Sequence, residues 1–412
     1  MTAVDAQMLW ISATIPNDQF LLYAFDGALG DPGAVVGELR RRAQACDELR
    51  LRVVEQGALR YPRWQRGAVG DDQFAVHGTG GLDWAGCLDE TGRLTHDQLD
   101  LHHMSWRAHI FPRVAGVPGV DGAGSVVVVQ IGHALGDGNR SAALAGVLLG
   151  RSWPVPVPAG ARRGFLPIRA VAAARAHRRL VRDIEAGLMP PPMPPRPVLS
   201  VNQRPRAVPV IRTIALRRDQ LGGPTVTVAA LAVIGEALAG YLVRRGEDPS
   251  RLGAEVPMAG ADRALAHNNF RNVGIGLYPD LERPGRAAAI AGDLAVQRRR
   301  GQHPAMRTSA ASFAAVPAPL LRWGVGQLDA DARSDTVTGN TVVSSVNRGP
   351  ADLSVGGCPV VLTAGFPGLS PMMSLTHGVH GIGKTIALSV HADPGNVDVD
   401  DYLAGLRAAL DV

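Results

Sequence analysis

The chain has 412 residues, of which 46% are hydrophobic and 19% are charged, and its formal net charge is +5 at pH 7. This length exceeds one ordinary hydrophobic core, so we expect two domains, and the composition excludes the disordered and fibrous classes. Cys46, Cys87 and Cys358 are far apart and odd in number, which indicates neither a disulfide framework nor a zinc site. Together with an N-terminus that lacks a basic and apolar leader, they predict a cytoplasmic protein.

The first 150 residues alternate predicted strands and helices. Strand patterns occupy residues 19–27, 49–56, 106–114 and 124–133, and apolar residues recur at helical spacing over 33–50. A helix rich in alanine and leucine is expected from 139 to 150, with Asn139 or Ser141 as its N-cap. We interpret residues 1–150 as an N-terminal α/β domain.

Residues 151–198 differ in composition and are predicted to be a crossover linker. Proline-rich runs at 151–160 and 189–198 flank "IRAVAAARAHRRLVRDIEAGL", residues 168–188, a helix candidate with many arginines. Its apolar residues lie partly on one face, with basic groups beside them. This helix is either a solvated crossover packed on the domains or an element that docks on an anionic membrane or lipid droplet, and both interpretations stay open.

Residues 199–412 are predicted to form a C-terminal domain of the same kind. Strands are expected within 208–221, 253–260, 272–281, 339–350, 359–368 and 383–394, and helices at 225–246 and 398–412. The first of these helices carries Glu236 in its middle, so we predict a buried helix and no membrane span. The glycines of "GVHGIGKT", residues 378–385, lack the spacing of a phosphate-binding loop. The predicted fold class is α/β, in an α+β two-layer form.

The stretch "IGHALGDGNR", residues 131–140, follows a continuous apolar strand and carries the chemistry. A histidine at a rigid strand end can remove a proton from a hydroxyl at neutral pH, if one ring nitrogen is free and the other is held. We therefore nominate His133 as a general base, with Gly136 and Gly138 leaving room for a substrate and Asp137 bracing the loop. The alternative is a satisfied, half-buried histidine followed by an Asp-Gly turn. No second histidine or cysteine stands at metal-ligand spacing, so no metal is predicted.

The segment "QIGHALGDG" is similar to the HHxxxDG motif of the CoA-dependent acyltransferase superfamily. More specifically, the chain resembles the bacterial wax ester synthase/diacylglycerol acyltransferase family nearly from end to end. The resemblance rests on "AVDAQMLW", "YPRW", "QLDLHHMSWR", "LSVNQRPRAVPVIRTIAL", "GAEVPMAGADRALAHNNFRNVGIGLYPDL" and "SSVNRGP", which occur in the family's order and spacing.

This resemblance implies two similar CoA-dependent acyltransferase-like domains with a tunnel between them. His133 would deprotonate an acceptor hydroxyl, which attacks the thioester of an acyl-CoA, while Asp137 holds the loop and Gly138 keeps the channel open. The acceptor would be a lipid hydroxyl, on diacylglycerol or a long-chain alcohol, and the enzyme would touch a membrane or lipid droplet peripherally. Acyl-CoA is a substrate, and no cofactor is implied. Nucleic-acid binding is not expected, because no aromatics interleave the basic residues.

The chain departs from the family pattern at several positions. Gly132 replaces the first motif histidine, and Thr227 and Val228 replace an Asn-Asp pair. "SSVNRGP" is one residue shorter than the family spacing. These departures leave two alternatives open: an acyltransferase whose acyl donor is bound to a carrier protein, and a non-catalytic homologue that binds acyl-CoA or lipid.

Two further groups of residues are candidates for substrate contacts. Ser345, or its neighbours Ser344 and Asn347, could donate a hydrogen bond to the oxyanion of a tetrahedral intermediate, although for Asn347 a turn is favoured. The cluster Arg298–Arg300 could pair with CoA phosphates or could be a solvated helix end.

Overall fold

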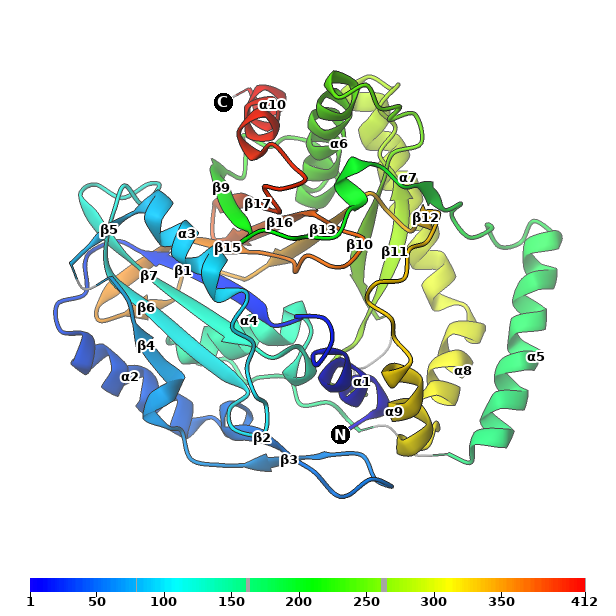
Figure 1. The fold of residues 1–412 in the computed structure, drawn as a ribbon, viewed down its shortest axis with the longest axis horizontal. Helices are drawn as coiled ribbons and strands as arrows, with labels where there is room; N and C mark the ends of the chain where they lie inside the picture. The colour runs from blue at the N-terminus through cyan, green and yellow to red at the C-terminus, as the bar shows by residue number, and fades with distance from the viewer. Residues whose placement is uncertain (79, 161–163, 261–264, 412) are drawn as a thin grey trace.

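Two large β-sheets organise the chain (Figure 1), which is described here from a computed structural model that covers residues 1–78, 80–160, 164–260 and 265–411. The first sheet is seven-stranded, with the order β14-β15-β1-β7-β6-β4 and with β5 beside β6. Its strands are β1 (Gln19–Phe25), β4 (Phe74–Val76), β5 (Leu82–Asp83), β6 (Trp106–Ala115), β7 (Ala123–Ile131), β14 (Ser354–Val355) and β15 (Cys358–Gly365).

The second sheet is six-stranded, with the order β11-β10-β13-β16-β17-β9. Its strands are β9 (Val210–Arg217), β10 (Gly253–Ala259), β11 (Phe270–Gly276), β13 (Thr341–Asn347), β16 (Leu375–Ile382) and β17 (Thr385–Ala392). Two small ribbons pair β2 (Leu51–Val54) with β3 (Arg63–Arg66), and β8 (Arg196–Pro197) with β12 (Thr336–Val337). The predicted α/β class with two related layered domains is confirmed.

Helices cover the sheets, and this explains the continuous apolar strands. The helices are α1 (Ala3–Ile11), α2 (Pro32–Ala45), α3 (Trp84–Leu94), α4 (Gly138–Leu148), α5 (Leu166–Glu185), α6 (Val226–Arg244), α7 (Arg283–Gln302), α8 (Pro304–Phe313), α9 (Ala318–Gly326) and α10 (Val399–Leu410). On one face of the first sheet α2 and α4 bury Leu21, Tyr23 and Phe25; on the other face α3 packs with Phe20 and Leu22. Because both faces are covered, the strands lose the polar alternation of a half-exposed sheet.

The first sheet is completed by the second half of the chain. Strand β15 pairs antiparallel with β1, with Leu21 opposite Gly365 and Tyr23 opposite Thr363. The predicted division into 1–150, 151–198 and 199–412 stays a prediction, but the sheets themselves cross it. Residues 161–163 of the linker and residues 261–264, within the stretch that carried part of the family resemblance, lie outside the described residues.

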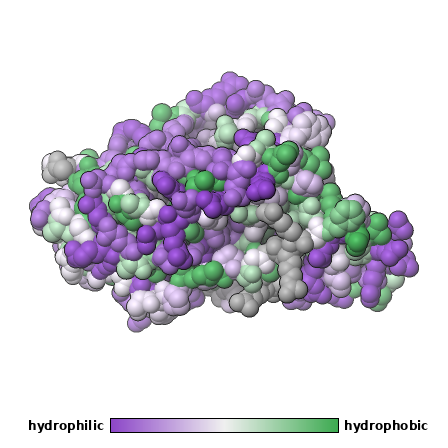
Figure 2. Space-filling view, turned by 90° about the horizontal axis from the view of Figure 1, so that it is seen from below, coloured by the Kyte–Doolittle hydropathy of each residue, from purple (hydrophilic) through white to green (hydrophobic). Residues whose placement is uncertain are grey.

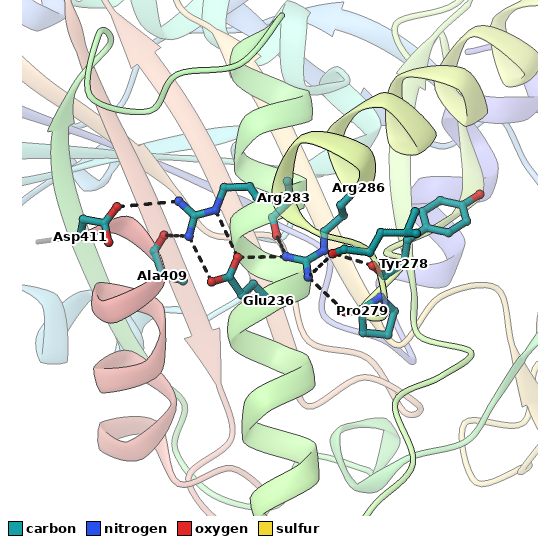
Figure 3. A network of polar contacts seen from close by, with 9 residues as sticks. Glu236, Tyr278, Pro279, Arg283, Arg286, Ala409 and Asp411 are labelled. Atoms are coloured by element: carbon teal, nitrogen blue, oxygen red, sulfur yellow. Dashed lines mark hydrogen bonds and ion pairs between the residues drawn. The ribbon is translucent and has the colours of Figure 1, made fainter.

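Helix α6 is the central helix of the second domain. It is long and apolar enough to cross a membrane by length and composition, yet most of its residues are buried against the second sheet, α7 and α10, as predicted. Figure 3 shows how its one carboxylate is used: Glu236 pairs with Arg283 at 3.1 Å and with the buried Arg286 at 3.0 Å, both on α7. Burial raises the pKa of Glu236, but the hydrogen bonds and charges of the two arginines outweigh it, and the net pKa is lowered.

Two local predictions need correction. Helix α4 begins at Gly138 with Asp137 as its N-cap, whose Oδ1 accepts the Arg140 N–H at 3.0 Å, so the choice of Asn139 or Ser141 was wrong. Asp137 caps the helix because its backbone is extended and its carboxylate can accept an N–H of the first turn. "GVHGIGKT" is part of the β16–β17 hairpin, and β16 was missed because a glycine-rich strand buried on both faces has no alternation to detect.

We expect Glu236→Gln to lower the free energy of unfolding by about 1–3 kcal/mol, because it leaves the buried Arg286 without a carboxylate. Urea denaturation measures this change. Glu185→Gln, at an exposed position of α5, is the control and should leave stability unchanged. An equal midpoint for Glu236→Gln and the wild type would contradict the assigned role.

Candidate active site

His133 stands where the two halves of the chain meet. Strand β7 ends at Ile131, and the short 3-10 turn η3 (His133–Leu135) then leads into α4. The imidazole lines a cavity of about 500 Å³. The walls of this cavity come from both halves: Asp18, Gln19, Phe20, Asp137 and Gly138 from the first, and Glu255, Phe270, Ser344, Ser345, Arg348, Phe366 and His380 from the second.

The tautomer of His133 is fixed by Asn268, a residue of the second half. Nδ1 of His133 lies 3.0 Å from Oδ1 of Asn268. The amide NH₂ of Asn268 donates to the backbone oxygen of His133 at 2.9 Å and to Oδ1 of Asp5 at 3.2 Å, so its oxygen must face the ring. The proton therefore sits on Nδ1, and Nε2, which bonds to no described residue, is left as an acceptor.

Asp5 on α1 holds Asn268 in place. Its carboxylate accepts the backbone N–H groups of Asn268 at 3.0 Å and of His267 at 3.3 Å, and the Thr2 hydroxyl at 2.7 Å. Burial raises the pKa of Asp5, and these hydrogen bonds act in the opposite direction. The sequence analysis assigned no role to Asp5 or Asn268, because they are 263 positions apart and no spacing rule joins them.

The surroundings of the His133 ring favour its neutral form. Phe270 stacks on it, with 5.5 Å between ring centroids and 30° between ring planes. Burial lowers the pKa of His133 below the ordinary value of 6.5, and the hydrogen bond to Asn268 and the charges of Asp137 and Asp5 only partly oppose this. A neutral imidazole with one open nitrogen is the state that a general base requires.

Asp137 is nearly buried and ties the halves together. Besides capping α4 through Oδ1, it accepts the backbone N–H of Asn269 through Oδ2 at 2.9 Å, and its own N–H donates to the His267 oxygen at 3.3 Å. Both carboxylate oxygens of Asp137 thus accept backbone N–H groups. This geometry fits a positioning role, in which Asp137 keeps the segment bearing Asn268 against His133.

The two glycines beside the motif occupy tight places. A Cβ on Gly138 would lie 3.3 Å from a methyl of Val346, so glycine keeps α4 close to β13 along the cavity. A Cβ on Gly132 would lie 2.7 Å from Cδ1 of Leu101, which is buried. A histidine at position 132 would therefore overlap the buried side chain of Leu101.

Ser345 lies at a gap in the second sheet. Strands β10 and β13 pair only at Ala254–Thr341 and Glu255–Val342 and then separate, next to Pro257, which has no N–H to offer a ladder. A second cavity of about 370 Å³ opens at this gap and shares Pro257, Ala259 and Ser345 with the first. The hydroxyls of Ser345 and Thr227 are hydrogen-bonded at 2.8 Å.

Ser344 and Asn347, the two neighbouring candidates, lie in different surroundings. Ser344 also lines the first cavity. Asn347 is exposed, and its Oδ1 accepts the Gly349 N–H at 3.0 Å, which is the turn that the sequence favoured.

The three arginines of the cluster Arg298–Arg300 make different contacts. Arg298 lines the second cavity together with Arg271 of β11. Arg299 donates to the Leu188 oxygen at 2.6 Å, and Arg300 donates to the Pro190 oxygen, so these two hold the linker. Only Arg298 of the three keeps the geometry for a phosphate contact at this cavity.

Helix α5 stands at the side of the molecule, packed on α8 (Figure 1). Phe165, Ile168 and Val171 are exposed on and just before it. Seen from below, the surface carries scattered apolar patches among hydrophilic residues (Figure 2). Helix α5 thus packs on α8 on one side and presents apolar side chains to solvent on another.

Comparison with known proteins shows the fold. No family model matches the chain, and no curated protein matches it in sequence. The wax ester synthase/diacylglycerol acyltransferase from Marinobacter aquaeolei superposes with a TM-score of 0.65 at 15% identity, over 99% of this chain and 97% of that one. The starter condensation domain of rhizomide synthetase, in complex with C8-CoA, gives a TM-score of 0.57 at 14% identity, over 100% and 93%. This chain has the two-domain fold of these structures.

We expect Gly132→His to destabilise the protein by about 1–3 kcal/mol, because the new side chain overlaps Leu101. Thermal unfolding measures the loss. Adding Leu101→Ala should recover part of it, and Ala172→His at an exposed position of α5 should cost little. A single variant as stable as the wild type would show that the site has room for the histidine.

Proposed function

We propose that this chain is an O-acyltransferase that moves a fatty acyl group from acyl-CoA to the hydroxyl of a lipid acceptor. One observation carries the proposal: His133 faces a cavity shared by both halves with Nδ1–H committed to Asn268 and Nε2 open. The fold likeness to an acyltransferase and to a condensation domain solved with C8-CoA supports it.

The reaction follows from this geometry. The acceptor hydroxyl donates a hydrogen bond to Nε2 of His133, and its proton moves to Nε2 as its oxygen attacks the thioester carbonyl carbon. Ser345 is proposed to donate to the resulting oxyanion, and Thr227 orients its hydroxyl. The intermediate then collapses with cleavage of the C–S bond, and the CoA sulfur takes the proton from Nε2. No cofactor enters this sequence, and no covalent enzyme intermediate forms.

The two cavities suggest where the donor lies. The second cavity brings Arg271 and Arg298 to one mouth, and guanidinium groups pair well with phosphates. We propose that the CoA phosphates bind there and that the pantetheine reaches His133 through the gap beside Ser345. The exposed apolar residues and arginines of α5 would let the enzyme rest on a membrane or lipid droplet, from the cytoplasmic side, while it takes its acceptor.

We expect His133→Ala to lower turnover of acyl-CoA by about 10²–10⁴-fold, the usual contribution of a general base. Release of free CoA thiol, with a panel of alcohols and diacylglycerol as acceptors, measures this. Acyl-CoA binding should persist in the variant. If the wild type binds acyl-CoA but turns over no acceptor, the chain is a binding homologue, and if it accepts only carrier-bound acyl groups, the donor assignment is wrong.

The rate should depend on pH in a defined way. Because burial lowers the pKa of His133, the neutral base is already present at pH 6.5, and the rate should fall only below that pH. The pH–rate profile of kcat/KM for the wild type measures the acid limb. A limb centred above pH 6.5 would contradict the assignment of the buried imidazole as the base.

Asn268→Ala should reduce kcat by about a hundredfold while KM changes little, because the ring loses the partner that fixes its tautomer and orientation. Steady-state kinetics measures the split between kcat and KM. A rise in KM alone would show that Asn268 serves binding instead of positioning the base.

A further inference from the structure

A buried arginine in the wall of the His133 cavity has no carboxylate partner among the described residues. Arg348 follows β13 and is 4% exposed. Its Nη1 donates to the Thr363 hydroxyl at 2.5 Å and to the Ala364 oxygen at 2.8 Å, and its guanidinium lies 5.1 Å from the ring centre of Tyr23. Its Nε is buried without a partner in the part of the chain that the structure describes.

No negative charge among the described residues compensates Arg348. The Tyr23 phenol lies beside it, and burial raises the pKa of this phenol, so it is neutral. None of the three carboxyls that line the cavity pairs with Arg348. Asp18 accepts through Oδ2 from Leu99 N at 2.7 Å and from Gln130, and its Oδ1 is buried without a partner among the described residues. Asp137 accepts backbone N–H groups through both oxygens, and Glu255 accepts from Asn272 at 2.6 Å. Burial raises the pKa of Asp18 to about 6, and burial also raises the pKa of Glu255 above its ordinary value. An unpaired buried charge is costly unless an anion joins it.

His380 of β16 converges on the same point as Arg348. A Cβ built on Gly365 of β15 would lie 2.6 Å from Nη2 of Arg348 and 2.9 Å from Nε2 of His380, so the glycine lets both groups pack side by side against this strand at the cavity wall. Nδ1 of His380 is buried and bonds to no described residue. Burial, and then the charge of Arg348, lower the pKa of His380, so it offers a neutral N–H beside the cation.

We propose that Arg348 and His380 form a carboxylate-binding site inside the cavity that holds His133, so that the acceptor is a hydroxy acid and not a neutral lipid alcohol. Arg348, His380 and Gly365 all line this cavity with His133. A guanidinium beside an N–H donor matches the two oxygens of a carboxylate, and the burial of Arg348 strengthens such bonds. This inference rests on the proposed function for the role of the hydroxyl, but the carboxylate site stands on its own geometry.

Two alternative roles for Arg348 explain fewer of its contacts than a carboxylate site does. As a brace between sheets, Arg348 needs only Nη1 and its contact with Tyr23, which leaves Nε and the neighbouring His380 unused. As a site for CoA phosphates, it would place a multiply charged group beside one cation, whereas two arginines, Arg271 and Arg298, line the adjoining second cavity. A brace predicts no preference for an anion, and a phosphate site predicts binding of a nucleotide.

The experiment measures binding without turnover. Isothermal titration compares 3-hydroxydecanoate with its methyl ester on the full chain, and we expect the acid to bind at least about tenfold more tightly, the effect of one charge-assisted hydrogen bond. Arg348→Met should abolish this preference, and Arg348→Lys should keep part of it. Gly365→Ala places a methyl group within 3 Å of both side chains and displaces them without removing the charge, so it should weaken binding of the acid even if Arg348→Met fails to fold. Arg218→Met, at an exposed position, is the charge control.

Each outcome decides one question. Equal affinity for acid and ester, or a preference that survives both Arg348→Met and Gly365→Ala, overturns the carboxylate site. Binding of 3′,5′-ADP that depends on Arg348 assigns the site to the donor and overturns the hydroxy-acid acceptor. Thiol release with the same two acceptors tests the proposed function separately: turnover without discrimination retains that function and refutes this inference. Arg348-dependent binding of the acid without turnover supports the carboxylate site and refutes the transferase.

Discussion

The site depends on one amide that joins three segments of the chain. The side-chain oxygen of Asn268 accepts a hydrogen bond from Nδ1–H of His133, its NH₂ donates to the backbone oxygen of the same residue, and Asp5 of α1 holds the amide in place. An imidazole left to rotate would present either nitrogen in either tautomer. Because this amide has one orientation that satisfies its partners, it decides which nitrogen faces the cavity, and the chemistry follows from that choice.

The same segment explains why the two halves work as one unit. Asp137 reaches across to the backbone of Asn269, and β15 from the second half pairs with β1 of the first sheet. His133 is mounted on one half and its orienting partner on the other. A displacement of the halves would therefore change the orientation of the His133 ring as well as the cavity.

Two glycines shape this cavity. Gly138 allows α4 to approach Val346, and Gly365 lets Arg348 and His380 pack side by side against β15. The fold persists at 15% identity to the wax ester synthase because burial pattern and topology need apolar residues in register, not particular ones. The shape of the cavity, by contrast, depends on the particular residue at each of these glycine positions.

The sequence by itself determined the α/β class, most strands, the buried helix around Glu236 and the prominence of His133, because these depend on local periodicity and short spacing. It did not reveal β16, the cap at Asp137 or the partners Asp5, Asn268, Arg348 and His380. Glycine-rich buried strands carry no period, and these partners are brought together from distant positions only when the two sheets pack. The tertiary structure alone decided which ring nitrogen is open and which charge lacks a partner among the described residues, because both are set by contacts between segments that no local pattern joins.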